Sequence, residues 1–275
     1  MAQNNLRVIY QNWADTSTVT ASSTMTGTGA FNLKKDTKSL VWRSNSVLIA
    51  SLTVNFGATR YINGVVLPFT NLTSAATMLV TVTGGDSYNT GAVLACPYAA
   101  SDTWDSTYLP VGANMYSYGA GNTARVWFPR AQGTGVTILI SDLLNPDDYL
   151  EASRLVIGDY WSPKFNTGYG MSVTPQDLSS NTRTEAGNLV TTRGIRFKTM
   201  QFDLSWLAPE DRTVFLRILK SNGLAKPLLV SLFPDCTEDY DKEQTYQIYG
   251  KLSQLSDISH PMFGIYSSNI ELEEV

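Results

Sequence analysis

Residues 194–223 read GIRFKTMQFDLSWLAPEDRTVFLRILKSNG and carry the clearest structural signal of the second half of the chain. Large apolar residues alternate with polar ones over residues 200–206, and a period of two puts the apolar set on one face of a strand. Pro209 suits the first position of a helix, because its missing N–H would have no partner there. The stretch therefore predicts an amphipathic strand, a tight turn and a helix of about four turns over residues 209–222.

The predicted helix has one apolar stripe, formed by Val214, Phe215, Ile218 and Leu219. Glu210 and Asp211 occupy its first turn, where carboxylates stabilise the positive end of the helix dipole. Gly223 follows the last turn, as expected for a C-cap. We expect the stripe to dock on the apolar face of the strand, which ends at Trp206, so that Trp206 is predicted to be buried.

Working outward, composition limits the class of protein. The chain has 275 residues, enough for two domains, with 16% charged and 11% aromatic residues. A net charge of −4 argues against non-specific nucleic-acid binding. No apolar run approaches the roughly 18 residues of a membrane span, so membrane insertion is not expected, and no secretory leader is visible. Cys96 and Cys236 are predicted to be free thiols, with a disulfide as the less favoured alternative.

The first half, residues 1–160, has many short Val/Ile/Thr/Tyr runs separated by polar, Gly-containing connections and no helix signal. This spacing predicts a jelly-roll β-sandwich. Its first strand is expected at residues 6–10. Longer strands are expected at 47–56 and at 60–69, the last ended by Pro68.

Residues 39–84, SLVWRSNSVLIASLTVNFGATRYINGVVLPFTNLTSAATMLVTVTG, resemble the core of a galactose-binding-like (discoidin-type) jelly roll. The resemblance lies in a Trp–x–Ser corner at residues 42–44, a strand at 52–57 and a further strand at 62–67. It implies the fold of the first domain. It leaves the function open, because this fold serves sugar binders, lipid binders and structural modules alike.

A long aromatic loop at residues 86–122 supplies the candidate site residues, Trp104, Tyr108, Tyr116 and Tyr118. They are set among Gly, Ser, Asn and Asp. Aromatic side chains in such a loop can pack against their own sandwich, anchor a subunit contact or stack on a sugar. All three interpretations stay open, with local packing favoured over a subunit contact and a subunit contact over a sugar site.

The second half, residues 161–275, is predicted to be a β-sandwich with the helix lying against it. Residues 174–193 are polar and weakly patterned, which indicates a protruding hairpin or arm. Residues 228–233 form a continuous apolar run that suits a buried strand.

Two segments of this half, RFKTMQFDLSWLAPEDRTVFLRILKSNGLAKPLLVSLFP (196–234) and YQIYGKLSQLSDISHPMFGIYSSNIELEEV (246–275), resemble the tail-tube-like module of bacteriophage tail-tip and distal tail (Dit-like) minor tail proteins. The resemblance implies a structural protein that forms a homo-oligomeric ring at the distal end of the tail tube. Its partners would be itself, other tail proteins (tube, hub and fibres) and, in the alternative role of a receptor-binding protein, a host surface glycan. It would be located in the virion after synthesis in the host bacterial cytoplasm. Those proteins commonly place the tube-like domain first, and this chain reverses that order.

Motifs of catalysis and cofactor binding are absent from the sequence. The single histidine, His260, and the two cysteines are too few for a His/Cys zinc site. There is no G-x-S-x-G elbow, dinucleotide fingerprint or P-loop. The acidic residues Asp235, Glu238, Asp239 and Asp241 lack the spacing of a calcium loop. We therefore expect neither catalysis nor a cofactor or metal, with a glycan-degrading enzyme as the third and least favoured alternative.

Overall fold

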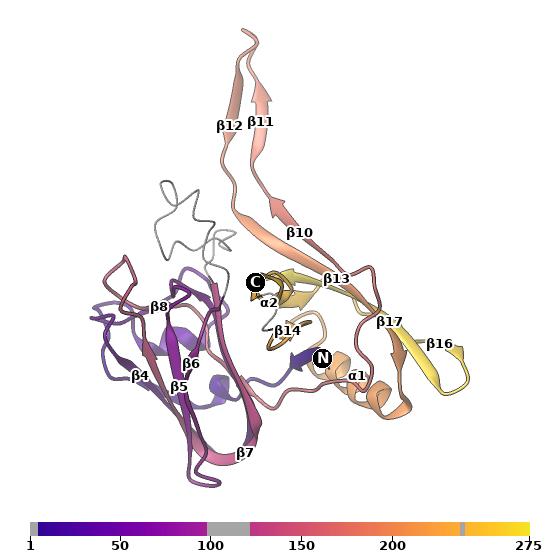
Figure 1. Cartoon of the computed structure of the whole chain (residues 1–275). Helices are drawn as coiled ribbons and strands as arrows, with labels where there is room; N and C mark the ends of the chain where they lie inside the picture. The colour runs from indigo at the N-terminus through magenta and orange to yellow at the C-terminus, as the bar shows by residue number, and fades with distance from the viewer. Residues whose placement is uncertain (1–4, 98–121, 237–239) are drawn as a thin grey trace.

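The computed structural model describes residues 5–97, 122–236 and 240–275. These residues form two large sheets, and helix α1 (Pro209–Asn222) packs against the second (Figure 1). The expected mainly β fold with one flanking helix is confirmed, and α1 begins and ends where the sequence predicts. The candidate site residues Trp104, Tyr108, Tyr116 and Tyr118 lie outside the described residues.

The first sheet has eight strands among the described residues, in the order β3-β8-β4-β7-β5-β6, with β2 and β9 also paired to β4. Their bounds are β2 (Thr18–Ala21), β3 (Trp42–Arg43), β4 (Ala50–Thr70), β5 (Thr77–Thr83), β6 (Asn89–Leu94), β7 (Asn122–Ser141), β8 (Glu151–Ala152) and β9 (Val156–Gly158).

Two bent strands turn this sheet into a sandwich. The pairing of β4 with β7 loses its register between Asn55 and Arg60, and both strands continue beyond that point into the facing layer. Gly133 lies at the bend, where a Cβ atom would come within 2.5 Å of the Val82 side chain. The predicted strands at 47–56 and 60–69 are therefore two halves of one strand.

The second half of β4 is buried on both faces. Val65 and Leu67 lie in the core of the sandwich. Val66 belongs to a separate apolar cluster with Ile9 and Leu229, which joins the sandwich to the second sheet. Double burial explains why this segment shows no apolar–polar alternation. The prediction that Pro68 ends the strand is wrong, because β4 continues to Thr70 past a register break.

The second sheet has the order β1-β14-β15-β17-β13-β10, with β16 paired to β17. The half expected as a β-sandwich is thus one sheet, with α1 on one face and the junction cluster on the other. The bounds are β1 (Arg7–Ile9), β10 (Ser172–Asp177), β13 (Arg196–Leu207), β14 (Leu228–Ser231), β15 (Gln247–Leu252), β16 (Ser259–Met262) and β17 (Ile265–Glu274); a second short helix is α2 (Tyr240–Thr245).

Residues 6–10, predicted as the first strand of the first domain, instead join the second sheet. β1 pairs antiparallel with β14, with Arg7 opposite Ser231. Leu6 and Val8 lie in the core under α1, and Ile9 faces the junction. The chain therefore starts in the second sheet, builds the sandwich and returns.

The apolar face of β13 differs from the prediction at its end. Phe202 and Leu204 are buried as expected, but the pairing with β17 shifts register between Leu204 and Leu207. The irregularity turns Leu207 into the core and leaves Trp206 52% exposed. The prediction that Trp206 is buried is wrong.

We expect Trp206→Ala to change the free energy of unfolding by no more than about 0.5 kcal/mol, the usual range for exposed sites. Phe202→Ala is the matched control, because Phe202 is 2% exposed on the same strand, and it should cost several times as much. Urea denaturation of both variants measures the difference. Equal losses would show that Trp206 is part of the core.

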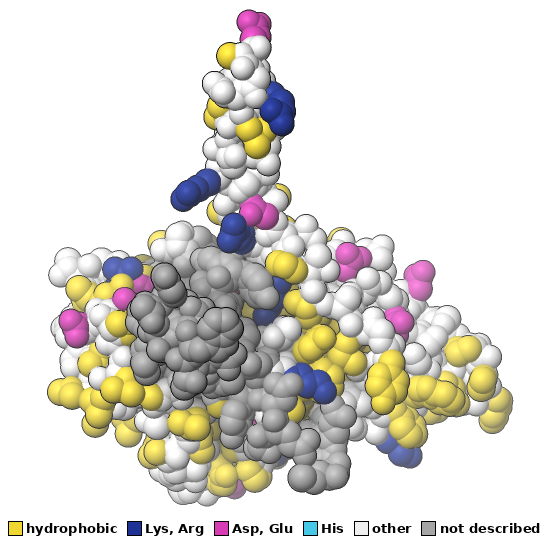
Figure 2. All heavy atoms as spheres, turned by 45° about the horizontal axis from the view of Figure 1, so that its top comes forward, with side chains coloured by type: hydrophobic (Ala, Val, Ile, Leu, Met, Phe, Trp, Pro, Cys, Tyr) yellow, Lys and Arg dark blue, Asp and Glu magenta, His cyan; other side chains and the backbone are white. Residues whose placement is uncertain are grey.

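The polar segment predicted at 174–193 forms an arm only beyond its first residues, because 174–177 belong to β10 and pair with β13 in the second sheet. Strands β11 (Ser180–Arg183) and β12 (Leu189–Thr192) pair only with each other among the described residues, beyond the point where β10 leaves β13. Every residue from 180 to 196 is exposed. Figure 2 shows the arm rising from the body of the molecule with apolar and charged side chains along it.

Candidate ligand-binding pocket

An open pocket of about 250 Å³ lies beside the bend of the sandwich. Its walls come from β4, β7, the 3-10 helix η1 (Trp13–Thr16) and the segments that join the two sheets. Eight residues line it: Tyr10, Gln11, Trp13, Thr59, Arg60, Tyr61, Arg130 and Asp159. The pocket thus combines aromatic rings with charged and neutral hydrogen-bonding groups.

Two arginine–aromatic pairs dominate the lining. The Arg60 guanidinium carbon lies 4.4 Å from the centre of the Trp13 ring. The Arg130 guanidinium carbon lies 4.1 Å from the centre of the Tyr61 ring. Cation–π attraction holds each planar guanidinium against a ring and limits its conformational freedom. The Tyr61 side chain nevertheless keeps 47% of its surface exposed.

The two arginines differ in their charge partners. Arg130 contacts the Asp159 carboxylate with both Nε, at 3.0 Å from Oδ2, and Nη2, at 2.8 Å from the same oxygen. Within the described part of the chain, no carboxylate forms an ion pair with Arg60. Two arginines against one aspartate give the pocket lining one excess positive charge.

Asn12 positions the Trp13 wall. Its Oδ1 accepts hydrogen bonds from the backbone N–H of Ala14, at 3.1 Å, and of Ile157, at 2.9 Å, and its Nδ2 donates to the Leu155 carbonyl at 2.9 Å. These bonds cap η1 and fasten it to β9. The Trp13 indole N–H then donates to the Tyr61 carbonyl on β4 at 3.2 Å.

Gly158 positions the Gln11 wall. A Cβ atom at residue 158 would lie 2.5 Å from Ile9 Cγ2 and 2.6 Å from the Gln11 carbonyl oxygen. Only glycine allows the segment after β1 to lie this close to β9. Beyond Gly158, the Tyr160 N–H donates to Asn63 Oδ1 at 2.6 Å, which fixes the segment that carries Asp159.

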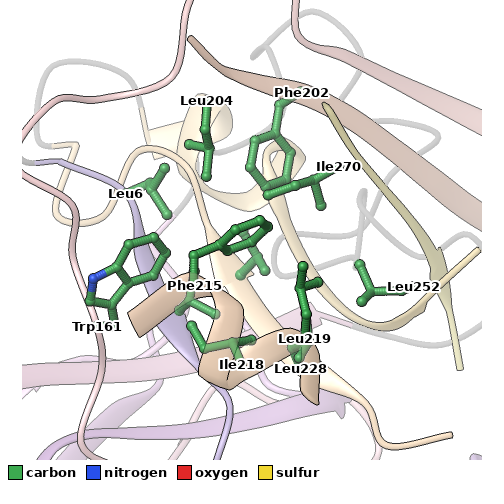
Figure 3. Close-up of a pocket in the computed structure, with 12 residues that line it drawn as sticks. Leu6, Trp161, Phe202, Leu204, Phe215, Ile218, Leu219, Leu228, Leu252 and Ile270 are labelled. Atoms are coloured by element: carbon green, nitrogen blue, oxygen red, sulfur yellow. The ribbon is translucent and has the colours of Figure 1, made fainter. Parts of the chain in front are cut away.

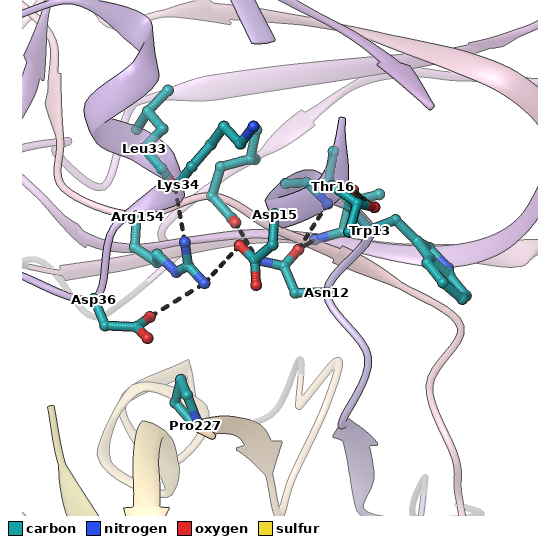
Figure 4. A network of polar contacts seen from close by, with 12 residues as sticks. Asn12, Trp13, Asp15, Thr16, Leu33, Lys34, Asp36, Arg154 and Pro227 are labelled. Atoms are coloured by element: carbon teal, nitrogen blue, oxygen red, sulfur yellow. Dashed lines mark hydrogen bonds and ion pairs between the residues drawn. The ribbon is translucent and has the colours of Figure 1, made fainter. Parts of the chain in front are cut away.

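A polar network anchors η1, the 3-10 helix that carries Trp13 (Figure 4). Arg154, only 3% exposed, forms ion pairs with Asp15 of η1 at 2.7 Å and with Asp36 at 3.1 Å. It also donates to the hydroxyl of Tyr249 on β15, which donates to Asp36. Burial raises the pKa of Tyr249, so the phenol keeps the proton that it donates. Burial also raises the pKa of Asp15 against the opposing effect of Arg154.

A second cavity, under α1, is not a ligand site (Figure 3). Its 12 lining residues are all apolar, and its volume is about 10 Å³, which is at most the space of one water molecule. Trp161 and Phe215 stack across it with ring centres 6.1 Å apart. It is the packed core between α1 and the second sheet.

The other residues considered in the sequence form no site in the described residues. His260 stacks on Tyr266 with ring centres 4.6 Å apart on exposed β16. No group of three or more His, Cys, Asp or Glu residues in the described ranges could hold a metal ion. Cys96 and Cys236 are free thiols, as predicted. Glu238 and Asp239 lie outside the described residues.

No helix in the described ranges has the length and apolar character needed to cross a membrane.

The sequence did not predict the pocket, because the residues that line it come from four separate segments. The adjacent Arg60 and Tyr61 and the Asn12–Trp13 pair are the local features that it uses, and neither pair has a distinctive spacing.

No known family model matches the sequence, and no curated protein does. Among solved structures, the chain is similar to the Clostridium perfringens module CpGH89CBM32-5, in complex with GalNAc-β-1,3-galactose, with 13% identity, a TM-score of 0.37 and coverage of 54% of this chain and 100% of that one. Chitosan-binding module 1 of a Paenibacillus chitosanase/glucanase has 17% identity, a TM-score of 0.37 and coverage of 54% and 99%. The lectin domain of lectinolysin, complexed with Lewis B antigen, has 14% identity, a TM-score of 0.36 and coverage of 57% and 98%. At such low TM-scores, these likenesses assign neither family nor ligand to this chain.

Proposed function

We propose that this chain is a carbohydrate-binding protein and that the pocket beside Tyr61 is its saccharide site. The observation that carries the proposal is the convergence of a half-exposed aromatic ring, two fixed arginines and a carboxylate in one cavity of about 250 Å³. A pyranose has an apolar C–H face and a rim of hydroxyl groups. An aromatic ring can pack against the C–H face, and charged or amide side chains such as Asp159 and Gln11 can form hydrogen bonds with the hydroxyl groups.

We further propose that the pocket binds saccharide without hydrolysing it. Glycoside hydrolysis ordinarily needs two carboxyl groups on either side of the scissile bond. Among the described residues, Asp159 is the single carboxylate in the pocket lining, and it is held by Arg130. A second carboxylate that could act as acid or nucleophile is not part of this wall.

The test uses Tyr61→Ala and the affinity for saccharides identified on an array of neutral and acidic oligosaccharides. Loss of the ring should weaken binding roughly tenfold, since an aromatic contact is worth on the order of 1 kcal/mol beyond its area. Tyr169→Ala is the matched control, because Tyr169 is fully exposed away from the pocket. Calorimetric titration measures both variants. If the array binds nothing, or if Tyr61→Ala binds as well as the parent, the pocket is not the saccharide site.

A second candidate function is structural. We infer it from the arm, a two-stranded ribbon that packs on nothing in the described part of the chain. Isolated hairpins are marginally stable in water, so such an arm needs a partner. The resemblance to phage tail-tip proteins suggests that the partner is another subunit or tail protein, in a ring at the distal end of a tail tube. In that setting the chain would belong to the virion, and the pocket would serve adsorption to a host glycan.

A further inference from the structure

We propose that the saccharide is acidic and that Arg60 binds its carboxylate or sulfate group. This inference rests on the proposed function, because it names the chemical class of ligand for the same pocket. It is carried by the contrast between the two arginines of the lining. Arg130 is neutralised by the carboxylate of Asp159. Arg60 lies over the Trp13 ring and forms no ion pair with a described carboxylate.

Arg60 is positioned as an anion-binding group. It is half-buried on β4, and its guanidinium carbon lies over the Trp13 ring, 4.4 Å from the ring centre. No side-chain hydrogen bond from Arg60 to a described residue is formed, so its N–H groups remain for water or a ligand. A guanidinium presents its N–H donors in a planar fork that matches two oxygens of a carboxylate or sulfate.

Buried arginines elsewhere in the chain are used differently. Arg125 places its guanidinium on both oxygens of Glu243, and Arg154 contacts two aspartates and a tyrosine hydroxyl. Those arginines are structural, because their donors are occupied by the protein. Arg60 is half-buried rather than buried, and it forms no ion pair with a described carboxylate, which leaves its charge for an anionic ligand.

The rest of the lining suits an acidic sugar rather than a free anion. Asp159 would repel an anion, but its charge is balanced by Arg130 at 2.8 Å. The exposed Tyr61 ring offers an apolar surface for a sugar ring, and the neutral Gln11 and Thr59 can exchange hydrogen bonds with its hydroxyl groups. An inorganic anion has no apolar face to place against the Tyr61 ring, so it would gain polar contacts only.

The experiment compares a galacturonic-acid oligosaccharide with a galactose oligosaccharide of the same length, titrated into the full chain at low ionic strength. The acidic probe should bind at least tenfold more tightly, and the difference should shrink as salt is added. Arg60→Gln should remove most of the difference between the two probes, whereas Arg60→Lys should keep part of it, because it preserves the charge without the fork. Melting temperatures verify that the variants are folded.

The outcomes separate this inference from the proposed function. If both probes bind equally and Arg60→Gln alters neither, the acidic-ligand inference is overturned while saccharide binding stands. If neither probe nor any saccharide on the array binds, both are overturned. Inorganic sulfate is the third probe, and affinity for sulfate equal to that for the acidic saccharide would overturn the inference, because the sugar ring would then contribute nothing.

Discussion

Glu243→Ala is expected to lower the free energy of unfolding by about 3–5 kcal/mol, because it leaves the buried charge of Arg125 without a partner. Arg125 lies on β7 of the sandwich, and Glu243 lies on α2 beside the second sheet. Their side chains form two hydrogen bonds, at 2.9 and 2.6 Å, and are 9% and 1% exposed. The pair therefore ties the two halves of the molecule together in a region that water does not reach.

Two further variants make this test specific. Arg125→Met combined with Glu243→Leu removes both charges, so the double variant should recover much of the loss. Asp177→Ala breaks an exposed pair with Arg196 and should lower the free energy of unfolding far less than Glu243→Ala does. Urea denaturation measures all three. A Glu243→Ala variant as stable as the parent would show that Arg125 and Glu243 do not join the two halves.

Shortening the arm is expected to abolish self-association of the chain. The variant replaces residues 180–192 with Asn-Gly, a turn that closes two paired strands. The removed strands contribute nothing to either core, so the melting temperature should stay within a few degrees of the parent value. The apolar side chains of the arm, Leu189 and Val190, are 56% and 52% exposed and should be covered by a second copy of the chain.

Light scattering over a range of concentrations measures the association. The parent chain should form an oligomer and the shortened chain a monomer. Val190→Asp is the point-substitution companion, because it keeps the ribbon but places a charge on the surface to be buried, and it should weaken association. A parent chain that stays monomeric at all concentrations would contradict a self-assembling role for the arm.

Local signals explain what the sequence predicted well. The bounds of α1 depend on Pro209, the acidic first turn and Gly223, all within one short stretch. The apolar face of β13 follows from strict alternation up to Leu204. The prediction fails at Trp206 because the pairing of β13 with β17 is irregular there. The partner strand lies more than 50 residues away in the sequence, so the local alternation of apolar and polar residues carries no information about this irregularity.

Long-range strand pairing and packing account for the features that the sequence did not predict. β1 is three residues long, and its partner β14 lies at the other end of the chain, so no local pattern could assign it to the second sheet. The pocket likewise depends on long-range packing, since Tyr10 and Gln11 line it where the segment after β1 lies close to Gly158 of β9. The aromatic residues of the loop at 86–122 that the sequence predicted as a site, such as Trp104, lie outside the described residues and stay candidates.

A crystal structure of the chain with the tightest-binding oligosaccharide from the array would show whether the pocket beside Tyr61 binds a saccharide. We expect a sugar ring against Tyr61, with hydroxyl groups at Asp159 and an acidic group at Arg60. A sugar bound elsewhere, for example against Trp104 or Tyr108, with the pocket beside Tyr61 empty, would contradict this expectation.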